Sequence, residues 1–431
     1  MASQSPVVAR PVVASPTKLA SVATPASAST ATATTAATTF DLGGGESLPV
    51  PADMAPLFSP YRLGGRFQLS NRIVYAPLTR MRATGTIPQP SAATYYAQRA
   101  VPGTLMISEG TNITSDALGY MNSPGLYLPE QLEAWKPVVK AVKDKGAVFF
   151  CQLWHTGRAS HPDFQTGGRP PLSSSTRRIT SPEYTVYTAN GPQPYPAPRA
   201  ATHEEIKQAV ADYARAAKNA VEVAGFDGVE IHGANGYLID QFIKDSINDR
   251  TDEYGGPIEN RARFALEVVE AVCEAVGADR VGLRLSPFTG FLDALDSTPY
   301  ATHTYLAEKL NAFGLAYLHM VEPRIVGIVE SGNHADSLEP FRRAYQGTFI
   351  AAGGYKADSG AAAVASGHAD LVAYGRWYLA NPDFHKRALL HAPLNKYDRD
   401  TFYSSGMEGY LDYPTLEQLQ QRQAAAAAAQ N

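Results

Sequence analysis

Short runs of β-branched and aliphatic residues alternate along the chain with longer segments whose apolar residues recur at helical spacing. From Pro56 onward this alternation is typical of successive βα units and of a parallel sheet. The runs predict strands at Arg72–Ala76, Thr104–Ser108, Val148–Leu153, Gly228–Ile231, Val281–Leu285, Tyr317–Val321, Phe349–Ala352 and Leu371–Tyr374. The helical segments are Pro129–Lys145, His203–Ala224, Ile258–Val276, Tyr300–Phe313 and Ala357–Ser366. The pattern therefore predicts an α/β fold of the TIM (β/α)8 barrel class.

The segment between the third and fourth predicted strands interrupts this rhythm. Residues Ser160–Arg199 are rich in Pro, Gly, Ser and Thr and include several tyrosines. Loops longer than about 12–15 residues in compact domains are usually lids, binding loops or disordered segments. We therefore expect a long excursion from the barrel here, which either covers a substrate or forms a disordered surface loop.

The two ends of the chain differ in composition from the part between them. Residues 1–45 are dominated by Ala, Ser, Thr, Val and Pro and have no acidic residue before Asp41. This composition is typical of an organellar transit peptide or of a disordered tail, so we expect a plastid protein or otherwise a cytoplasmic one. Residues 416–431 form a low-complexity tail, and we expect the barrel domain within residues 56–415.

Composition excludes several functional classes. In this chain of 431 residues, 44% are hydrophobic and 18% charged, which indicates a globular protein with a large core. The net charge is −4 and the basic residues are dispersed, so we expect no nucleic-acid partner. No apolar run approaches the roughly 20 residues that cross a bilayer, so we also expect no membrane partner. Cys151 and Cys273 lie in apolar stretches without metal-ligand spacing, which argues against an iron–sulfur or other metal site.

Polar residues or glycines follow each predicted strand, at the end where barrel enzymes carry their catalytic loops. The fourth strand gives the most informative case, because Val229-Glu-Ile-His-Gly-Ala-Asn-Gly-Tyr237 places His232, Asn235 and Tyr237 close together. In isolation such a histidine could cap a turn and the tyrosine could serve packing. The recurrence of polar strand ends along the chain favours an active site.

Glycines follow the last two predicted strands, as Gly353-Gly354 and Gly375-Arg376. Barrels that bind phosphorylated ligands use the loops after strands seven and eight. Bare backbone N–H groups can surround an anion, and an arginine adds charge-assisted hydrogen bonds. These residues predict a phosphate site, although a glycine pair alone is more often a turn.

Two polar side chains are embedded in apolar strands. Arg284 lies in Val-Gly-Leu-Arg-Leu-Ser-Pro, and a buried guanidinium must either be paired or face a ligand. Gln152 lies near Trp154, and its carboxamide offers both a donor and an acceptor. An internal ion pair for Arg284 and a structural hydrogen bond for Gln152 remain open as alternatives.

Six segments, in order along the chain, resemble the Old Yellow Enzyme family of flavin-dependent ene-reductases, and within it the 12-oxophytodienoate reductase-like members of plants and algae. They are Ala76-Pro-Leu-Thr-Arg-Met-Arg82, Gln152-Leu-Trp-His-Thr-Gly-Arg158, the His232 segment, Asn248-Asp-Arg-Thr-Asp-Glu-Tyr-Gly-Gly256, Glu259-Asn-Arg-Ala-Arg-Phe264 and Leu394-Asn-Lys-Tyr-Asp-Arg-Asp-Thr-Phe-Tyr403. The resemblance extends from about Pro56 to Pro414 and is specific.

The resemblance implies FMN, held noncovalently across the C-terminal mouth of the barrel, and NADPH as reductant. By similarity Pro77 and Thr79 line the flavin and Gly110 approaches its ring. Gln152 would bind the pyrimidine edge, and Arg284 would lie where negative charge builds on reduction. The phosphate would be held by Gly353, Gly354, Gly375 and Arg376.

The resemblance also implies a ping-pong reaction in which NADPH reduces FMN and an α,β-unsaturated carbonyl compound then takes its place. His232 and Asn235 resemble the pair that binds the carbonyl oxygen, and Tyr237 the proton donor to the α-carbon. Arg324 and Tyr403 are expected to contact substrate. The expected substrate is a small enone, which includes oxylipin cyclopentenones such as 12-oxophytodienoate, and the expected assembly is a monomer or homodimer.

Two positions depart from family patterns: Asn235 stands where many plant members carry a second histidine, and Gly354 where yeast-type members carry an asparagine. Two other functional classes are alternatives. A phosphate-binding barrel aldolase or isomerase usually needs a lysine or carboxylate base at a strand end, and no such lysine is found. A flavin-binding barrel with a sensing role and no turnover would have no need of the complete His232, Asn235 and Tyr237 set.

Overall fold

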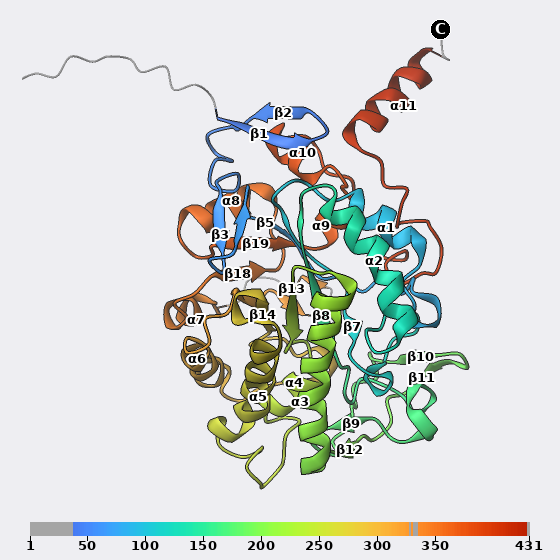
Figure 1. The fold of residues 1–431 in the computed structure, drawn as a ribbon, viewed down its shortest axis with the longest axis vertical. Helices are drawn as coiled ribbons and strands as arrows, with labels where there is room; N and C mark the ends of the chain where they lie inside the picture. Colours follow the sequence, from blue (N-terminus) through green and yellow to red (C-terminus); the bar gives the residue numbers. More distant parts are fainter. Residues whose placement is uncertain (1–37, 327–328, 331–334, 429–431) are drawn as a thin grey trace, which may run out of the picture. The chain divides into compact units, whose positions relative to one another are not determined.

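Eight parallel strands close into a barrel in the computed structural model, which describes residues 38–326, 329–330 and 335–428. Each strand is hydrogen-bonded to the next, and the last pairs with the first. Figure 1 shows the helices outside these strands. The barrel strands are β5 (Ile73–Tyr75), β6 (Leu105–Ile107), β8 (Val148–Trp154), β13 (Gly228–His232), β14 (Val281–Leu285), β15 (Tyr317–Val321), β18 (Phe349–Ala352) and β19 (Leu371–Tyr374). The predicted TIM barrel is confirmed.

Helices connect successive strands, because neighbouring parallel strands require a crossover connection. They are α1 (Pro90–Ala97), α2 (Pro129–Lys143), α3 (His203–Lys218), α5 (Ile258–Val276), α6 (Pro299–Leu310), α7 (Glu339–Ala344) and α8 (Ala357–Ala365). Helix α10 (Phe384–Leu389) follows the last strand, and the short helices α4 (Leu238–Ile243) and α9 (Arg376–Leu379) begin directly after strand ends. Within the described ranges, none of the helices has both the length and the apolar character that crossing a bilayer requires.

Helix α3 begins at a capping box and ends in an irregular turn. The Thr202 hydroxyl accepts a hydrogen bond from the Glu205 backbone N–H (3.2 Å), and the Glu205 carboxylate accepts one from the Thr202 N–H (3.1 Å). The predicted helix over 203–224 is α-helical only to Lys218, and residues 219–224 wind as a π-helix. Gly225 then adopts a positive φ of 89°, which ends the helix.

A hairpin fills the N-terminal end of the barrel. It consists of β3 (Tyr61–Leu63) and β4 (Phe67–Leu69), which pair antiparallel. Leu63 and Leu69 are buried in one apolar cluster with the interior side chains Phe150 and Tyr317. The polar interior side chains of the strands are therefore separated from solvent at this end.

The excursion Ser160–Arg199 is ordered, so the alternative of a disordered loop is wrong. Its strands β9 (Leu172–Ser173) and β12 (Arg199–Ala200) pair in parallel, and β10 (Val186–Thr188) and β11 (Gly191–Gln193) form a hairpin. Ile179, Val186 and Tyr195 are buried in a cluster with Trp154 and Tyr237. The excursion therefore packs against the loop that follows β13.

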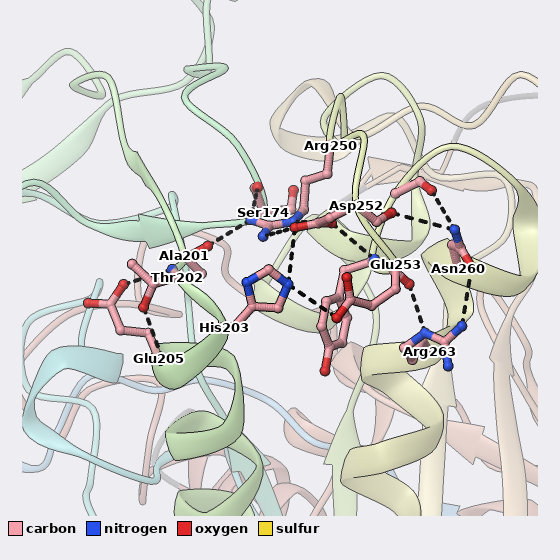
Figure 2. Close-up of polar contacts among 12 residues, drawn as sticks. Ser174, Ala201, Thr202, His203, Glu205, Arg250, Asp252, Glu253, Asn260 and Arg263 are labelled. Atoms are coloured by element: carbon pink, nitrogen blue, oxygen red, sulfur yellow. Dashed lines mark hydrogen bonds and ion pairs between the residues drawn. The ribbon is translucent and has the colours of Figure 1, made fainter.

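Arg250, in the segment after α4, binds the excursion at Ser174 and the chain just after the excursion at Ala201. Its guanidinium donates to the carbonyls of Ser174 (3.1 Å) and Ala201 (2.7 Å) and forms a bidentate pair with Asp252 (Figure 2). The motif Asn248–Gly256, quoted above for the family resemblance, thus has a structural role here.

The same region brings His203, Asp252 and Glu253 together, with one ligand atom of each within 4.8 Å of the others (Figure 2). Asp252 already accepts hydrogen bonds from Arg250 on both oxygens, and His203 Nε2 lies 3.2 Å from Glu253 Oε1. We interpret this group as an ion-pair cluster at the start of α3.

The folded part of the chain begins before the predicted boundary at residue 45. Strands β1 (Thr39–Gly43) and β2 (Glu46–Pro49) form an antiparallel hairpin, and Phe40 packs on Phe58 with ring centroids 4.8 Å apart. Phe40 is the only fully buried residue of β1. With so few apolar positions, the sequence of β1 is hard to distinguish from that of the segment before it. Residues 1–37 of the predicted transit-peptide-like segment lie outside the described residues.

Three further short strands and one helix complete the elements. Strand β7 (Thr111–Asn112) extends the sheet beside β8, and β16 (Ile325–Val326) pairs with β17 (Val329–Glu330). Helix α11 (Leu416–Ala428) occupies most of the predicted C-terminal tail, and residues 429–431 lie outside the described residues.

Candidate active site

A cavity opens where β5, β18 and β19 end. Its unoccupied volume, which includes solvent at the open mouth, is about 870 Å³. The residues predicted for ligand binding that line it are Pro77, Thr79, Arg284, Gly353, Gly354, Gly375, Arg376 and Tyr403. The ends of strands distant in sequence therefore meet at one hollow, as the barrel topology requires.

One wall of the cavity is bare backbone. Gly353 has a φ of 132°, and a Cβ there would lie 2.7 Å from Ile325 Cγ1, so a larger residue is excluded. Gly354 has a φ of 67°, and a Cβ on Gly375 would lie 3.2 Å from Leu78. With Arg376 on the same wall, this backbone and guanidinium fit a phosphate group.

Arg284 lines the same cavity from β14. It lies opposite His232 of β13 and His319 of β15 in the strand register. Burial lowers the pKa of Arg284, while the negative charge of Glu230 acts in the opposite direction. Its Nε is buried and has no hydrogen-bond partner among the described residues. An unsatisfied cationic donor at a cavity wall fits an electron-rich ligand edge.

His232 is buried at the end of β13, with its ring stacked over Trp154 (6.2 Å) and edge-on to Tyr237 (5.1 Å). Burial, and then the charge of Arg284, hold the pKa of His232 well below its usual range, so the imidazole is neutral. Its Nδ1 has no hydrogen-bond partner within the described part of the chain. The ring therefore keeps a hydrogen-bonding atom for a ligand.

Asn235 adopts a left-handed backbone conformation with a φ of 58°, which asparagine tolerates better than most residues. Its N–H donates to Ser286 Oγ at 2.7 Å, and the next N–H, of Gly236, donates to Asp240 Oδ2 at 2.8 Å. Asp240 in turn pairs with Lys244 (3.1 Å), and both side chains are fully buried. This pair fixes the loop that presents Asn235.

Tyr237 precedes α4 and is buried against Trp154, with their rings edge-to-face at 5.0 Å. Its hydroxyl donates to the hydroxyl of Tyr120 at 3.1 Å. Burial raises the pKa of Tyr237 above the usual value, and the phenol therefore stays protonated at neutral pH. Tyr120 was missed from the sequence, because nothing in its loop marks it as a neighbour of Tyr237.

Gln152 lies inside the barrel on β8, and its Nε2 donates to Glu230 Oε1 at 2.8 Å. Neither residue is among those that line the cavity. Glu230 was also missed, although a signal was present: it lies two residues before His232, and side chains alternate along a strand. Glu230 and His232 therefore lie on the same face of β13.

The remaining predicted residues lie at the edges of the site. A Cβ on Gly110 would lie 2.5 Å from the Trp154 ring, so this glycine makes room for Trp154, and it does not line the cavity. Arg324 contacts the glycine wall, with its Nε donating to the Gly353 carbonyl (2.7 Å) and its guanidinium over Tyr355 (4.5 Å). Tyr403 is 44% exposed and lines the mouth.

Comparison with known proteins identifies relatives over most of the chain. Residues 56–395 match the model of the NADH:flavin oxidoreductase / NADH oxidase family. The chain is 54% identical over 366 residues to 12-oxophytodienoate reductase 1 of Oryza sativa subsp. japonica, covering 84% of this chain and 94% of the relative. It is 52% identical over 365 residues to 12-oxophytodienoate reductase 2 of Arabidopsis thaliana, covering 84% and 96%.

Solved structures with the same fold include morphinone reductase in complex with tetrahydroNAD, at 44% identity and a TM-score of 0.78, covering 84% of this chain and 97% of that one. An old yellow enzyme homologue from Zymomonas mobilis matches at 39% identity and a TM-score of 0.79, covering 84% and 99%. The resemblance inferred from the six sequence segments is confirmed. The chain belongs to the NADH:flavin oxidoreductase / NADH oxidase family.

Proposed function

We propose that this chain is an FMN-dependent ene-reductase, which uses a nicotinamide cofactor to reduce the C=C bond of α,β-unsaturated carbonyl compounds. The observation that carries the proposal is the cavity that joins the bare glycine wall and Arg376 to Arg284, with Arg284 directly opposite His232 in the strand register. The relatives named 12-oxophytodienoate reductase and the complex of morphinone reductase with tetrahydroNAD support the same activity.

The residues of the cavity fit FMN. Gly353, Gly354, Gly375 and Arg376 would hold the phosphate, and Arg284 supplies a buried donor with no other partner among the described residues. Pro77 and Thr79 would line the ring. When bound, FMN supplies the chemistry that these side chains lack, since it accepts hydride from a nicotinamide and gives hydride to an activated C=C bond.

His232 and Asn235 would bind the carbonyl oxygen of the substrate. Hydrogen bonds to this oxygen stabilise the negative charge that develops there as the β-carbon is reduced. The neutral imidazole of His232 is suited to this role, because its Nδ1 has no competing partner in the described residues. Asn235 is held in place through its backbone by Ser286.

Tyr237 would donate a proton to the α-carbon. Its phenol remains protonated in the ground state and is held against Trp154 and Tyr120. In the structure Tyr237 donates to Tyr120 at 3.1 Å. When the Tyr237 proton moves to the α-carbon, this hydrogen bond would reverse, and donation from Tyr120 to the phenolate would lower the barrier.

The proposed function is tested by measuring product formation. The purified chain, supplied with FMN, NADPH and 2-cyclohexenone, is expected to form cyclohexanone in step with nicotinamide oxidation. Nicotinamide oxidation without cyclohexanone would support a flavin oxidoreductase that does not act on enones. Conversion of an aldol substrate with no redox change would instead support the aldolase or isomerase class.

Finer assignments follow from the relatives and the sequence. We infer that cyclopentenone oxylipins such as 12-oxophytodienoate are substrates, since the relatives carry that name. We also infer NADPH as the preferred reductant, a monomer or homodimer as the assembly, and a plastid address encoded in residues 1–45. Kinetics with both nicotinamides, light scattering and sequencing of the mature N-terminus test these points in turn.

A further inference from the structure

Glu230 is a fully buried carboxylate inside the barrel, two residues before His232 on β13. It accepts hydrogen bonds from three side chains of neighbouring interior positions: Gln152 Nε2 (2.8 Å), Tyr317 Oη (3.1 Å) and His319 Nδ1 (2.8 Å). The cluster joins interior positions of three barrel strands, β8, β13 and β15.

The carboxylate is charged. Burial alone would raise the pKa of Glu230, but hydrogen bonding and the charges of His319 and Arg284 outweigh it, so the pKa lies below the ordinary value. Burial lowers the pKa of His319 in turn. A carboxylate can only accept hydrogen bonds, so the Nδ1–H of His319 is the donor to Glu230. Burying an ion in this way is costly unless its partners are fixed.

The negative charge of Glu230 determines how the amide of Gln152 is turned. A carboxylate can only accept hydrogen bonds, so Gln152 must direct an N–H toward it. The opposite orientation would place two oxygens in contact. The carbonyl oxygen of Gln152 therefore faces away from Glu230.

Glu230 also acts on the charge of Arg284. The two residues lie on adjacent strands, since Glu230 is opposite Gly282 and His232 is opposite Arg284. After burial, the carboxylate of Glu230 is the strongest influence on the protonation of Arg284, and it favours the cation. The field of Arg284 in the cavity is accordingly reduced by a nearby opposite charge.

We propose that Glu230 is a positioning residue for FMN. It would turn the Gln152 carbonyl oxygen toward the pyrimidine edge of the flavin. It would also offset the positive charge of Arg284, and this offset would lower the midpoint potential of the bound flavin. This inference rests on the proposed function. It adds to it a residue that sets flavin affinity and potential without lining the cavity.

The test is Glu230→Gln, which removes the charge and keeps the shape. The new carboxamide oxygen can still accept from Tyr317 and His319, and its NH₂ can donate to Gln152 only if the Gln152 amide turns over. FMN is expected to bind about tenfold more weakly, as for the loss of one well-formed hydrogen bond. The midpoint potential of bound FMN is expected to rise by about 30 mV, which corresponds to a tenfold change in a two-electron equilibrium.

Asp370→Asn is the matched control. Asp370 accepts hydrogen bonds from the Phe349 N–H (2.8 Å) and from Arg342 (3.1 Å) at the N-terminal end of β18, far along the strand from the cavity. Its replacement removes the same charge and is expected to leave the flavin potential unchanged. An equal rise in both variants would overturn the assignment to Glu230, because it would indicate a general charge effect.

A second measurement needs no variant. Titration of the unmodified apoprotein with 3-methyl-FMN, which lacks the N–H of the pyrimidine edge, is expected to show at least tenfold weaker binding than FMN. Equal binding of the two flavins would overturn the proposed orientation of Gln152. If the protein binds neither flavin, the proposed function itself fails. If it binds FMN and reduces enones while Glu230→Gln keeps the original affinity and potential, this inference alone fails.

Discussion

The hydroxyl of Tyr237 donates to the hydroxyl of Tyr120 at 3.1 Å, although 117 residues separate them in the sequence. Trp154 holds both rings, stacked on Tyr120 at 5.2 Å and edge-to-face with Tyr237 at 5.0 Å. Tyr195 of the excursion packs in the same cluster as Tyr120 and Tyr237. The proposed proton donor is therefore part of a group of phenols assembled from three separate loops.

Tyr237→Phe is expected to slow reduction of the enone by roughly 100-fold or more, because general acids contribute about 10²–10⁴ to rate. Flavin reduction by the nicotinamide should be retained. Stopped-flow absorbance measures the two half-reactions separately. Tyr213→Phe on α3, which removes another buried hydroxyl, is the control and should change neither step. Unchanged enone turnover in Tyr237→Phe would contradict the proposed donor role.

Tyr120→Phe keeps Tyr237 but removes the hydroxyl that can stabilise its phenolate. Loss of one hydrogen bond of about 1 kcal/mol predicts a reaction with enone that is about fivefold slower. The solvent isotope effect on this step should rise, since proton transfer becomes more fully rate-limiting. A slower reaction with an unchanged solvent isotope effect would instead indicate that Tyr120 only shapes the substrate site.

Arg376→Gln tests whether the cavity wall formed by Gly353, Gly354, Gly375 and Arg376 binds the FMN phosphate. Hydrogen bonds to charged groups contribute about 1.5–3 kcal/mol, so FMN affinity should fall roughly 10- to 100-fold. Binding of riboflavin, which has no phosphate, should be unaffected, and fluorescence titration compares the two. Arg399→Gln is the matched control, because Arg399 also stacks on Tyr397 (5.5 Å, against 5.4 Å for Arg376) but does not line the cavity. Equal loss of both flavins in Arg376→Gln would contradict phosphate binding here.

Glu109, at the end of β6, predicts a pH dependence of stability. Burial raises the pKa of Glu109 from 4.5 to about 7, although a hydrogen bond from the Arg80 N–H (3.2 Å) lowers it in part. The folded state therefore keeps a proton that the unfolded chain loses above pH 4.5. The free energy of unfolding accordingly falls as pH rises through this window, by about 3 kcal/mol in total.

Glu109→Gln mimics the neutral acid and removes this loss. The variant should match the unmodified apoprotein at pH 5 and exceed it by up to about 3 kcal/mol at pH 8, as measured by urea unfolding. A stability difference that does not vary with pH would show that Glu109 is not protonated in the folded state.

The sequence predicted the barrel strands well, because each is a short run dominated by apolar residues and followed by glycine or polar residues. It also predicted several of the residues that line the cavity, since parallel strands bring their C-terminal ends together wherever they lie in the chain. Arg284 is an example, because a cation in an apolar strand needs a ligand or a counter-charge. In the structure Arg284 lines the cavity, where a ligand can reach it, and the carboxylate of Glu230 supplies a counter-charge.

What the sequence could not give are relationships that exist only once the barrel is closed. Tyr120 lies in a loop with no periodicity, and only the closed fold brings it to Tyr237. Glu230 could have been placed on the same side of its strand as His232, but its contacts with Gln152 and His319 come from other strands. The order of the excursion likewise depends on Arg250, which is distant in sequence from Ser174.

The central claim is tested most directly by the absorbance spectrum of the purified chain under anaerobic conditions. The account predicts a yellow protein with one FMN per chain, whose visible absorbance is bleached by NADPH and restored by 2-cyclohexenone in the absence of oxygen. A colourless protein that takes up no FMN, or a bound flavin that NADPH bleaches but 2-cyclohexenone fails to restore, would contradict it.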